Sequence, residues 1–425
     1  MNKILLVAYY FRPCNYVGAN RANAFADFFA EKGWDVTVVT RAWTGTEKVW
    51  EDYLDSQEGE PRIVKEASGV KIHYLPYKAF RFPENRILAS LKTATRNLTG
   101  RFHFELEFDQ YQDYIAELIK KEKFNYVLAS SPPLTVLKVA ADASENTATK
   151  LLVDIRDFEN DILLYQEPRL SLLRKLQFRV LMMYFQKWIK GAACIFTASP
   201  PFTTFIAKKT DKEVFTLTNG FDDLVSTIRA EPYPDLFNIS VIGTLYKEAN
   251  IDTLLEGIEL LFRENPSVKI KFNLIGVKAL PDVAKRFENV IPESKLNLTH
   301  RVNRSEALEV AARSHVLLLA GFDTMKGVYT TKVFEYLGLR KNIIQVPGDG
   351  DVVEELLNYT QSGKAPHSAE EFCSVIMDWY REWEQTGKLE FNGIDSRINE
   401  YSRRSQFQKL YTFLSKTDAK SGAKV

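Results

Sequence analysis

Short apolar runs of strand length recur along the whole chain. Seven of them occupy residues 4–10, 35–40, 70–75, 125–131, 151–157, 193–199 and 213–220. They are apolar at successive positions, which is typical of parallel strands covered by helices on both faces. Between the first two runs, Ala22, Phe25 and Phe29 fall on one helical face and Gly33 follows. This spacing predicts a helix that ends at the glycine, and so a β-α-β unit.

The pattern breaks after residue 220 and then restarts. A polar stretch contains Pro232 and Pro234, and further apolar runs follow at residues 239–243, 271–276, 296–302, 315–321 and 342–346. Amphipathic segments lie between these runs. Two successive sets of strand-helix units predict an α/β chain with two doubly wound domains, joined near residues 221–236. Such domains, facing each other, form a cleft at the carboxyl ends of their strands, where ligands bind.

Composition and charge narrow the class of protein. The chain has 425 residues, enough for two or three domains, and its formal net charge of +1 gives no sign of a nucleic-acid partner. The three cysteines are far apart in the sequence, which predicts neither a disulfide framework nor a metal knuckle. No apolar run approaches the roughly 18 residues that span a bilayer. We therefore expect a cytoplasmic protein, in contact with a membrane only at a surface.

The first candidate site is the segment VIGTLYKEANIDTLLEGI. The predicted strand ends at Gly243, a helix starts near Asn250, and Thr244 and Lys247 lie in the turn between them. Such a turn directs backbone N–H groups and the positive end of a helix at an anion. Lys247 adds a full charge that suits a diphosphate. The alternative is an ordinary loop with a solvated lysine.

The second candidate site is the segment LAGFDTMKGVYTTKVFEYLGL. Thr330 and Thr331 have the character of a helix N-cap, Lys332 follows in the first turn, and Glu335 lies one turn further on the same side. The paired oxygens of a carboxylate can accept both hydroxyls of a ribose. A cation at a helix N-terminus is unfavourable unless an anion binds there. The alternative is that Lys332 and Glu335 are surface charges.

These segments resemble a known family. GTLYKEANIDTLLEGI and TTKVFEYLGLRKNII resemble the donor-binding half of retaining glycosyltransferases with the GT-B fold, family 4 in particular. LLVDIRDF, ASSPP, TNGFD and the final YSRRSQFQKLYTFL also resemble segments of that family, in the same order. The resemblance covers nearly the whole chain. It implies two Rossmann-like domains facing across a cleft, an acceptor-side domain at 1–225 and a donor-binding domain at 226–395. Residues 396–425 would form a helix that crosses back to the first domain, with a polar tail.

The resemblance also implies roles for individual residues. On the donor side it implies Gly243, Thr244, Lys247, Val302, Thr331, Lys332 and Glu335. Lys247 would pair with the diphosphate, Val302 would lie at the base, and Glu335 would hold the ribose as the second glutamate of an E-x7-E motif. On the acceptor side it implies Gly18, Arg21, Ser131 and Arg156, with Asp157 orienting the acceptor hydroxyl. Lys247, Glu335 and Asp157 are thus the candidate catalytic residues.

The chain departs from the family pattern at two positions. Gly327 stands where the first glutamate of the motif is expected, and Thr244 stands where an arginine is common. Recognition of the donor sugar must therefore be remodelled. A second acidic motif, Asp349-Gly350-Asp351, resembles a metal-binding D-x-D, but its place before a predicted helix favours an N-cap.

The expected function is transfer of a sugar from a UDP- or GDP-linked donor to a glycan or lipid-linked acceptor, with retention of configuration, in cell-surface polysaccharide biosynthesis. No metal and no cofactor is expected. A nucleotide-sugar epimerase of the same fold and a non-catalytic partner protein remain open as alternatives. Two basic, amphipathic segments, residues 78–104 and 170–191, are candidates for contact with the inner face of a membrane or with a lipid-linked acceptor.

Overall fold

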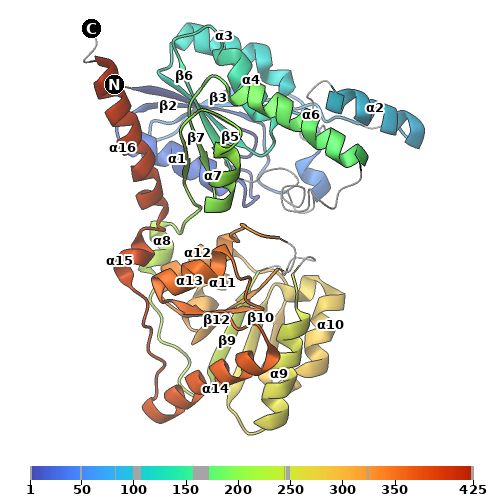
Figure 1. Ribbon diagram of the computed structural model, residues 1–425, viewed down its shortest axis with the longest axis vertical. Coiled ribbons are helices and arrows are strands. Elements are labelled where there is room, and N and C mark those ends of the chain that lie inside the picture. The colour runs from blue at the N-terminus through green and yellow to red at the C-terminus, as the bar shows by residue number, and fades with distance from the viewer. Residues whose placement is uncertain are drawn as a thin grey trace. The chain divides into compact units, whose positions relative to one another are not determined.

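The chain divides into two compact units, Met1–Leu217 and Thr218–Val425. The computed structural model (Figure 1) describes residues 2–47, 50–81, 83–98, 107–156, 172–243, 245, 249–322 and 325–422. Each unit is an open, twisted sheet with helices on both faces, because its strands are apolar on both sides and must be covered twice.

The first unit is built on an eight-stranded sheet. Its strand order is β3-β4-β2-β1-β5-β6-β7-β8, and all neighbouring pairs are parallel except β3 with β4. The strands are β1 (Lys3–Ala8), β2 (Asp35–Arg41), β3 (Arg62–Lys65), β4 (Lys71–Leu75), β5 (Tyr126–Ser131), β6 (Lys150–Ile155), β7 (Ala192–Thr197) and β8 (Val214–Thr216). The helices are α1 (Ala19–Glu31), α2 (Arg86–Leu98), α3 (Gln112–Glu122), α4 (Thr135–Ser144), α6 (Leu172–Ile189) and α7 (Pro200–Ala207), with short 3-10 turns at Trp50–Tyr53 and Asp109–Tyr111.

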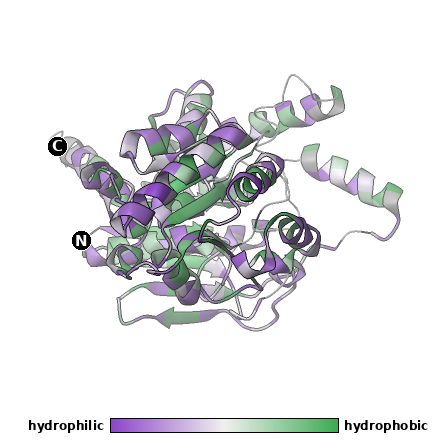
Figure 2. Cartoon of the chain, turned by 90° about the horizontal axis from the view of Figure 1, so that it is seen from below, coloured by the Kyte–Doolittle hydropathy of each residue, from purple (hydrophilic) through white to green (hydrophobic). Residues whose placement is uncertain are grey.

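Alternate residues of the first sheet enter two apolar layers. Leu5 and Val7 of β1 belong to the core that α4 and α6 cover. On the opposite face, Phe25 of α1 packs its ring 5.9 Å from that of Phe196 on β7. Hydrophobic residues accordingly gather in the central strands, whereas the helices carry hydrophobic and hydrophilic residues in alternation along their length (Figure 2).

The second unit is built on a smaller, entirely parallel sheet. Its order is β11-β10-β9-β12-β13-β14. The strands are β9 (Phe237–Ile242), β10 (Ile270–Ile275), β11 (Leu296–Thr299), β12 (Val316–Ala320), β13 (Asn342–Val346) and β14 (Gly363–Lys364). The helices are α8 (Asp223–Thr227), α9 (Asp252–Glu264), α10 (Pro281–Val290), α11 (Arg304–Ala312), α12 (Thr331–Leu339), α13 (Val352–Thr360), α14 (Ala369–Thr386), α15 (Asp395–Asn399) and α16 (Arg403–Gly422), with 3-10 turns at Val277–Ala279 and Glu293–Lys295.

Alternation along β12 shows how the second sheet is covered. Val316 and Leu318 enter the core beneath α9 and α14, while Leu317 and Leu319 enter the core beneath α11, α12 and α13. In open parallel sheets of this kind ligands bind outside the carboxyl ends of the strands, so a site is expected at the loops after β9, β11, β12 and β13.

The α/β class with two Rossmann-like domains is confirmed, and each predicted strand appears within a few residues of its expected range. The helix predicted to end at Gly33 is α1, and Gly33 has a left-handed φ of 78°. Two strands were not predicted, β3 and the two-residue β14. Among the described residues, no helix has both the length and the apolar character needed to cross a membrane.

Candidate active site

Gly243 and Lys332 come together at the carboxyl edge of the second sheet. Gly243 ends β9 with a left-handed φ of 82°, a conformation that glycine adopts without the steric cost of a side chain. A Cβ placed there would lie 3.4 Å from Lys332 Cε and 3.9 Å from Lys332 Nζ. The lysine therefore extends back from α12 to Gly243 at the end of β9.

Lys332 stands at the N-terminus of α12. Thr330 is the N-cap residue, and the helix begins at Thr331. The Thr330 hydroxyl is buried and has no hydrogen-bond partner among the described residues. Thr330 and Lys332 line a small cavity of about 20 Å³ together with Val241, Leu245, Ala249, Leu318, Leu319, Ala320 and Phe322. The other lining residues are apolar and the cavity has room for about one water molecule. The lysine and the helix N-terminus, which lie together here, both favour an anion beside the cavity.

The ammonium of Lys332 is desolvated by its surroundings, which disfavours its charged form. Burial lowers its pKa to about 8, and Glu335, which favours the charged form, offsets this only in part. A desolvated lysine at a helix N-terminus is a candidate for an anion-binding site.

Glu335 lies one turn further along α12 and is held by Arg304 at the start of α11. The Arg304 Nε and Nη2 atoms lie 2.9 Å and 2.8 Å from Glu335 Oε1, and Arg304 Nη2 also donates to Asp222 Oδ2 at 2.9 Å. Arg403 of α16 reaches the same Asp222 oxygen at 3.3 Å. Burial works against the charge of Arg304, but Glu335 and Asp222 outweigh it and raise its pKa.

This arrangement orients the Glu335 carboxylate without closing it off. Its Oε1 atom accepts from Arg304, and the side chain is only half-buried. Val302 lies two residues before Arg304 in the loop after β11, half-buried against the core under α11 and α12. Arg304, which contacts Glu335, thus lies two residues after Val302 in the sequence.

Gly327, where the resemblance places a glutamate, lies beside a carboxylate from another loop. Its backbone N–H donates to Asp351 Oδ2, and Lys326 Nζ donates to the Asp349 carbonyl. Asp349 accepts from the backbone N–H groups of Asp351 and Glu354 at the start of α13, at 3.0 Å and 3.1 Å. The acidic motif thus behaves as a helix cap at Asp349, while the carboxylate of Asp351 turns toward the glycine loop.

The four predicted acceptor-side residues form one cluster in the first unit. Arg21 Nε lies 3.1 Å and 3.0 Å from the two carboxylate oxygens of Asp154 on β6, and Arg21 Nη2 lies 2.8 Å from Asp154 Oδ1. Ser130 Oγ donates to the same carboxylate at 2.7 Å, and Ser131 Oγ donates to the Asp154 carbonyl at 3.2 Å. Arg21 is 4% exposed and Asp154 is fully buried, so this ion pair supports the fold from inside.

Gly18 and Arg156 form the outer part of the cluster. Arg156 Nη1 donates to the Gly18 carbonyl, just before α1 begins. A Cβ at Gly18 would lie 2.7 Å from the Tyr16 ring and 3.1 Å from Arg156 Nη2. Glycine is therefore required for the close packing of this loop against Arg156.

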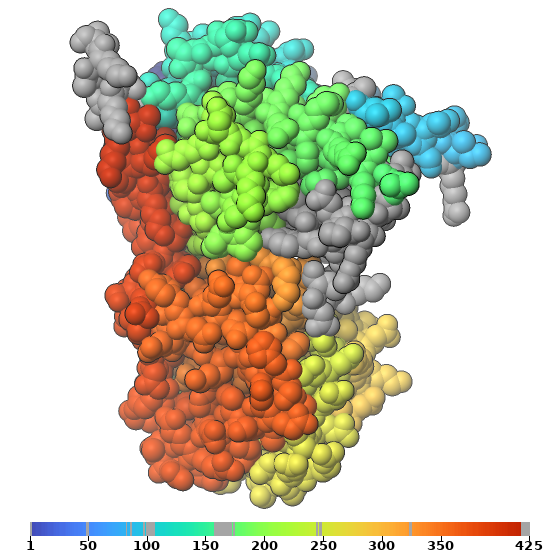
Figure 3. Space-filling view, in the orientation of Figure 1, coloured from blue at the N-terminus to red at the C-terminus, as the bar shows by residue number. Residues whose placement is uncertain are grey.

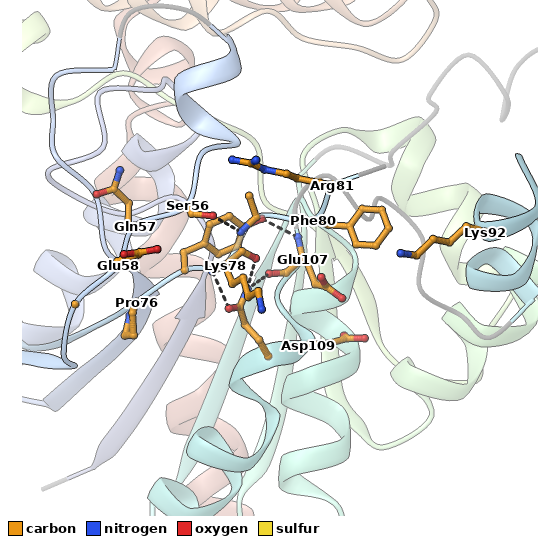
Figure 4. A pocket seen from close by; sticks show the side chains of 14 residues that line it. Ser56, Gln57, Glu58, Pro76, Lys78, Phe80, Arg81, Lys92, Glu107 and Asp109 are labelled. Carbon is orange, nitrogen blue, oxygen red and sulfur yellow. Dashed lines mark hydrogen bonds between the residues drawn. The ribbon is translucent and has the colours of Figure 1, made fainter. Parts of the chain in front are cut away.

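A larger hollow, of about 1030 Å³, lies elsewhere in the first unit (Figure 4). It is lined by the loop after β4, the loop that contains Ser56–Gly59, residues 107–110 and one side chain of α2, Lys92. Lys92 points toward the ring of Phe80, with Nζ 4.6 Å from its centroid. The cations Lys78, Arg81 and Lys92 and the acids Glu58, Glu107 and Asp109 make it a polar hollow.

Three predicted site residues, Thr244, Lys247 and Asp157, lie outside the described residues. Three residues that matter to the geometry were missed: Asp154, Asp222 and Arg304. Asp154 carried a signal, because a carboxylate in the middle of an apolar strand needs a buried partner. Asp222 ends the TNGFD segment that resembles the family, but its contact with Arg304 carried no signal, since the two residues are 82 positions apart.

No family model matches the sequence, and no curated protein matches it either. Solved structures do resemble the fold. Sucrose-phosphate synthase from Thermosynechococcus elongatus aligns with a TM-score of 0.67 and 11% identity, over 98% of this chain and 100% of the other. A glycosyltransferase from Rickettsia africae aligns with a TM-score of 0.61 and 14% identity, over 97% of each chain. HepE from Anabaena, solved in complex with UDP and glucose, aligns with a TM-score of 0.60 and 13% identity, over 98% of this chain and 100% of the other.

The fold is GT-B. At these identities the likeness concerns the architecture alone. The GT-B fold places the second-unit cluster, from Gly243 to Lys332 and Glu335, at the carboxyl ends of a parallel sheet, where such sheets bind ligands.

Proposed function

We propose that the protein is a glycosyltransferase that moves a sugar from a UDP- or GDP-linked donor to a glycan or lipid-linked acceptor. In this proposal the transfer retains the anomeric configuration and contributes to cell-surface polysaccharide biosynthesis, as the family resemblance implies. The observation that carries the proposal is the position of Lys332: at the N-terminus of α12, over the Gly243 turn, and one helical turn before Glu335. Complexes of the Anabaena protein HepE with UDP and with UDP-glucose give further support for a nucleotide-sugar donor.

The donor would bind along the carboxyl edge of the second sheet. Its diphosphate would meet the ammonium of Lys332 and the first N–H groups of α12. The ribose would meet Glu335, already oriented by Arg304, and the base would lie near Val302. The sugar would lie near Asp351, whose carboxylate is beside Gly327 and replaces the missing glutamate of the motif.

The chemical step in this proposal is electrostatic. The bond between the anomeric carbon and the donor phosphate breaks, the acceptor oxygen bonds to that carbon, and the departing phosphate oxygen takes the acceptor's proton. The developing negative charge on the diphosphate is what Lys332 and the α12 N-terminus would stabilise, because they are already in place before the reaction. Lys247 would add a second cation, and Asp157 would orient the acceptor; both roles stay predictions.

The test is to incubate the full-length protein with UDP-glucose or GDP-mannose and follow the reaction by NMR. Without an acceptor we expect slow hydrolysis to free sugar and nucleoside diphosphate. When the correct glycan is added, the nucleoside diphosphate should be released faster and the sugar should appear on the glycan. Retention is read from the anomeric signal of the transferred sugar. The Glu335→Ala variant should lose this activity while staying folded.

Two other outcomes would contradict the proposal. Conversion of the donor sugar into its epimer, with the nucleotide still attached, would make the protein an epimerase. Failure to bind either UDP or GDP, measured by calorimetry on the same sample, would make it a non-catalytic protein that has the fold without the donor site.

A further inference from the structure

Exposed apolar side chains gather on two neighbouring helices of the first unit, α2 and α6. Among the described residues, thirteen large hydrophobic side chains are exposed, and seven of them lie on these two helices. They are Ile87, Leu88, Leu91 and Leu98 of α2, and Leu172, Leu176 and Met183 of α6. We call this set the α2–α6 surface. Such a concentration exceeds the scattered single exposures that are normal for a folded surface.

The two helices lie side by side (Figure 1). The Tyr184 hydroxyl of α6 donates to the carbonyl of Leu98, the last residue of α2, at 2.8 Å. In the space-filling view, α2 stands out from the body of the first unit as a blue projection (Figure 3). None of its residues is buried among those whose side chains are described. A helix of 13 residues gains most of its stability from packing an apolar face, so α2 requires a partner surface.

The exposed residues of α6 follow helical spacing. Leu172, Leu176, Arg179, Met183 and Lys187 are exposed at intervals of three or four residues, which puts them along one side of the helix. Buried residues such as Phe178, Phe185 and Trp188 occupy the other side. Apolar and cationic side chains therefore share the outward face, as in helices that lie in the plane of a membrane interface.

The charge on these helices has one sign. Three Lys or Arg residues occur in α2 and four in α6, and neither helix contains Asp or Glu. Lys92 lies over the ring of Phe80, with Nζ 4.6 Å from its centroid, and also lines the hollow of the first unit. Arg96 lies over the same ring but is paired with Glu107 at 2.8 Å, so the cations that contribute to the surface are the other lysines and arginines of the two helices. The surface is thus complementary to an anionic partner.

We propose that the α2–α6 surface docks the protein on an anionic phospholipid bilayer. The leucines and the methionine would enter the boundary between headgroups and acyl chains, while the cations would remain among the phosphates. A second copy of the chain fits less well, because a two-fold contact would bring these cations against identical cations. A nucleic acid would attract the cations but would leave the seven apolar side chains in water.

The test is co-sedimentation of the full-length protein with vesicles. We expect binding to vesicles that contain phosphatidylglycerol, weak binding to vesicles of phosphatidylcholine alone, and release at high salt. The Leu91→Ser and Leu176→Ser changes should each lower the partition coefficient about tenfold. Lys92→Gln and Arg179→Gln should each lower it about fivefold. Matched controls are Leu224→Ser on α8 and Lys285→Gln on α10, both exposed and outside the surface, which should leave binding unchanged.

Three results would overturn the proposal. The first is failure to bind anionic vesicles, and the second is equal binding by the surface variants and the controls. The third is a dimer in light scattering that Leu91→Ser abolishes in a protein with no affinity for vesicles. UDP affinity is measured on the same variants and should not change. A protein that binds UDP but not vesicles would therefore contradict the docking surface and leave the proposed function intact. A protein that binds vesicles but not UDP would contradict the proposed function and leave the docking surface intact.

Discussion

The charged clusters of the two units differ in the surroundings of their desolvated cations. In the first unit, Arg21 and Asp154 neutralise each other inside the protein, and Ser130 completes the hydrogen bonding. In the second unit, burial holds the pKa of Lys332 down to about 8, and the Thr330 hydroxyl beside it has no partner in the described structure. A buried ion pair supports the fold, whereas a desolvated lysine at a helix N-terminus is a candidate for ligand binding.

The largest effect is expected from breaking the buried ion pair. Asp154→Ala leaves the Arg21 guanidinium buried without its counter-charge, which should lower the unfolding free energy of the first unit by about 3–5 kcal/mol. Urea unfolding followed by circular dichroism measures this. Arg304→Ala, which breaks the more exposed ion pair of the second unit, is the control and should cost no more than about 1 kcal/mol. If Asp154→Ala and Arg304→Ala lower the unfolding free energy by similar amounts, the first-unit ion pair does not support the fold more than the second-unit one.

Next in size is the loss of Glu335 from the second-unit cluster. Glu335→Ala should lower kcat/KM by the equivalent of about 2–3 kcal/mol of transition-state binding, because a charged hydrogen-bond acceptor for the ribose is lost. Its unfolding free energy should stay near that of the wild type, since the side chain is half-buried. Steady-state kinetics with the natural donor and with its 2′-deoxyribose analogue show whether the lost contact is the one to the ribose 2′-hydroxyl. If the variant loses as much with the deoxy donor as with the natural one, Glu335 does not hold that hydroxyl.

Replacing Lys332 should weaken UDP binding without lowering the stability of the protein. Lys332→Met should weaken UDP binding by about 1.5–2 kcal/mol, the scale of one charged contact. The unfolding free energy at neutral pH should be unchanged or higher, because the folded state no longer holds a desolvated ammonium. Calorimetric titration and urea unfolding on one preparation give both values. Lower stability with unaltered UDP affinity would make Lys332 a structural residue.

The sign of the Lys332 pKa shift also predicts how the stability difference between the wild type and Lys332→Met depends on pH. The pKa of Lys332 is lowered on folding from 10.5 to about 8. Below pH 8 the lysine is charged in both states and its full destabilising effect is present. Between pH 8 and 10.5 the unfolded chain holds the extra proton, so the stability of the wild type should rise toward that of Lys332→Met. UDP affinity of the wild type should fall as the pH rises past 8, because the diphosphate then meets a neutral amine.

The smallest effect is expected at the turn itself. Gly243→Ala forces a side chain into a left-handed conformation and should cost about 1 kcal/mol of stability. UDP affinity should fall by a similar amount, because the new methyl group lies 3.4 Å from Lys332 Cε. Gly33→Ala, at a φ of 78° with open space around it, is the matched control: it should lose stability alone. Equal UDP affinity in Gly243→Ala and Gly33→Ala would show that Gly243 is not part of the donor site.

The parallel strands and the positions of the candidate residues could be predicted because both depend on local patterns. Apolar runs in the sequence correspond to β1, β5 and β9, and the spacing of Lys332 and Glu335 placed them correctly on one helix. The exposed edge strand β3 could not be found, because Ile63 in it is 56% exposed and no alternating apolar face distinguishes the strand. Edge strands lack the burial on which such predictions depend.

Contacts between segments far apart in the chain could not be predicted from the sequence. Nothing in the segment around Gly327 indicates that the Asp351 carboxylate, 24 positions away, lies beside it. Likewise, Arg21 was predicted to line the acceptor side, but only the structure shows that Asp154, 133 positions away, binds its guanidinium. Such pairs are selected by the packing of whole elements, and a local pattern contains no record of that packing.

A crystal structure of the protein with UDP is the most direct test of the donor site. We expect the diphosphate within hydrogen-bonding distance of Lys332 Nζ and the α12 N-terminus, and a ribose hydroxyl on the Glu335 carboxylate. UDP bound anywhere else, for example in the hollow lined by Lys78 and Arg81, would contradict the account.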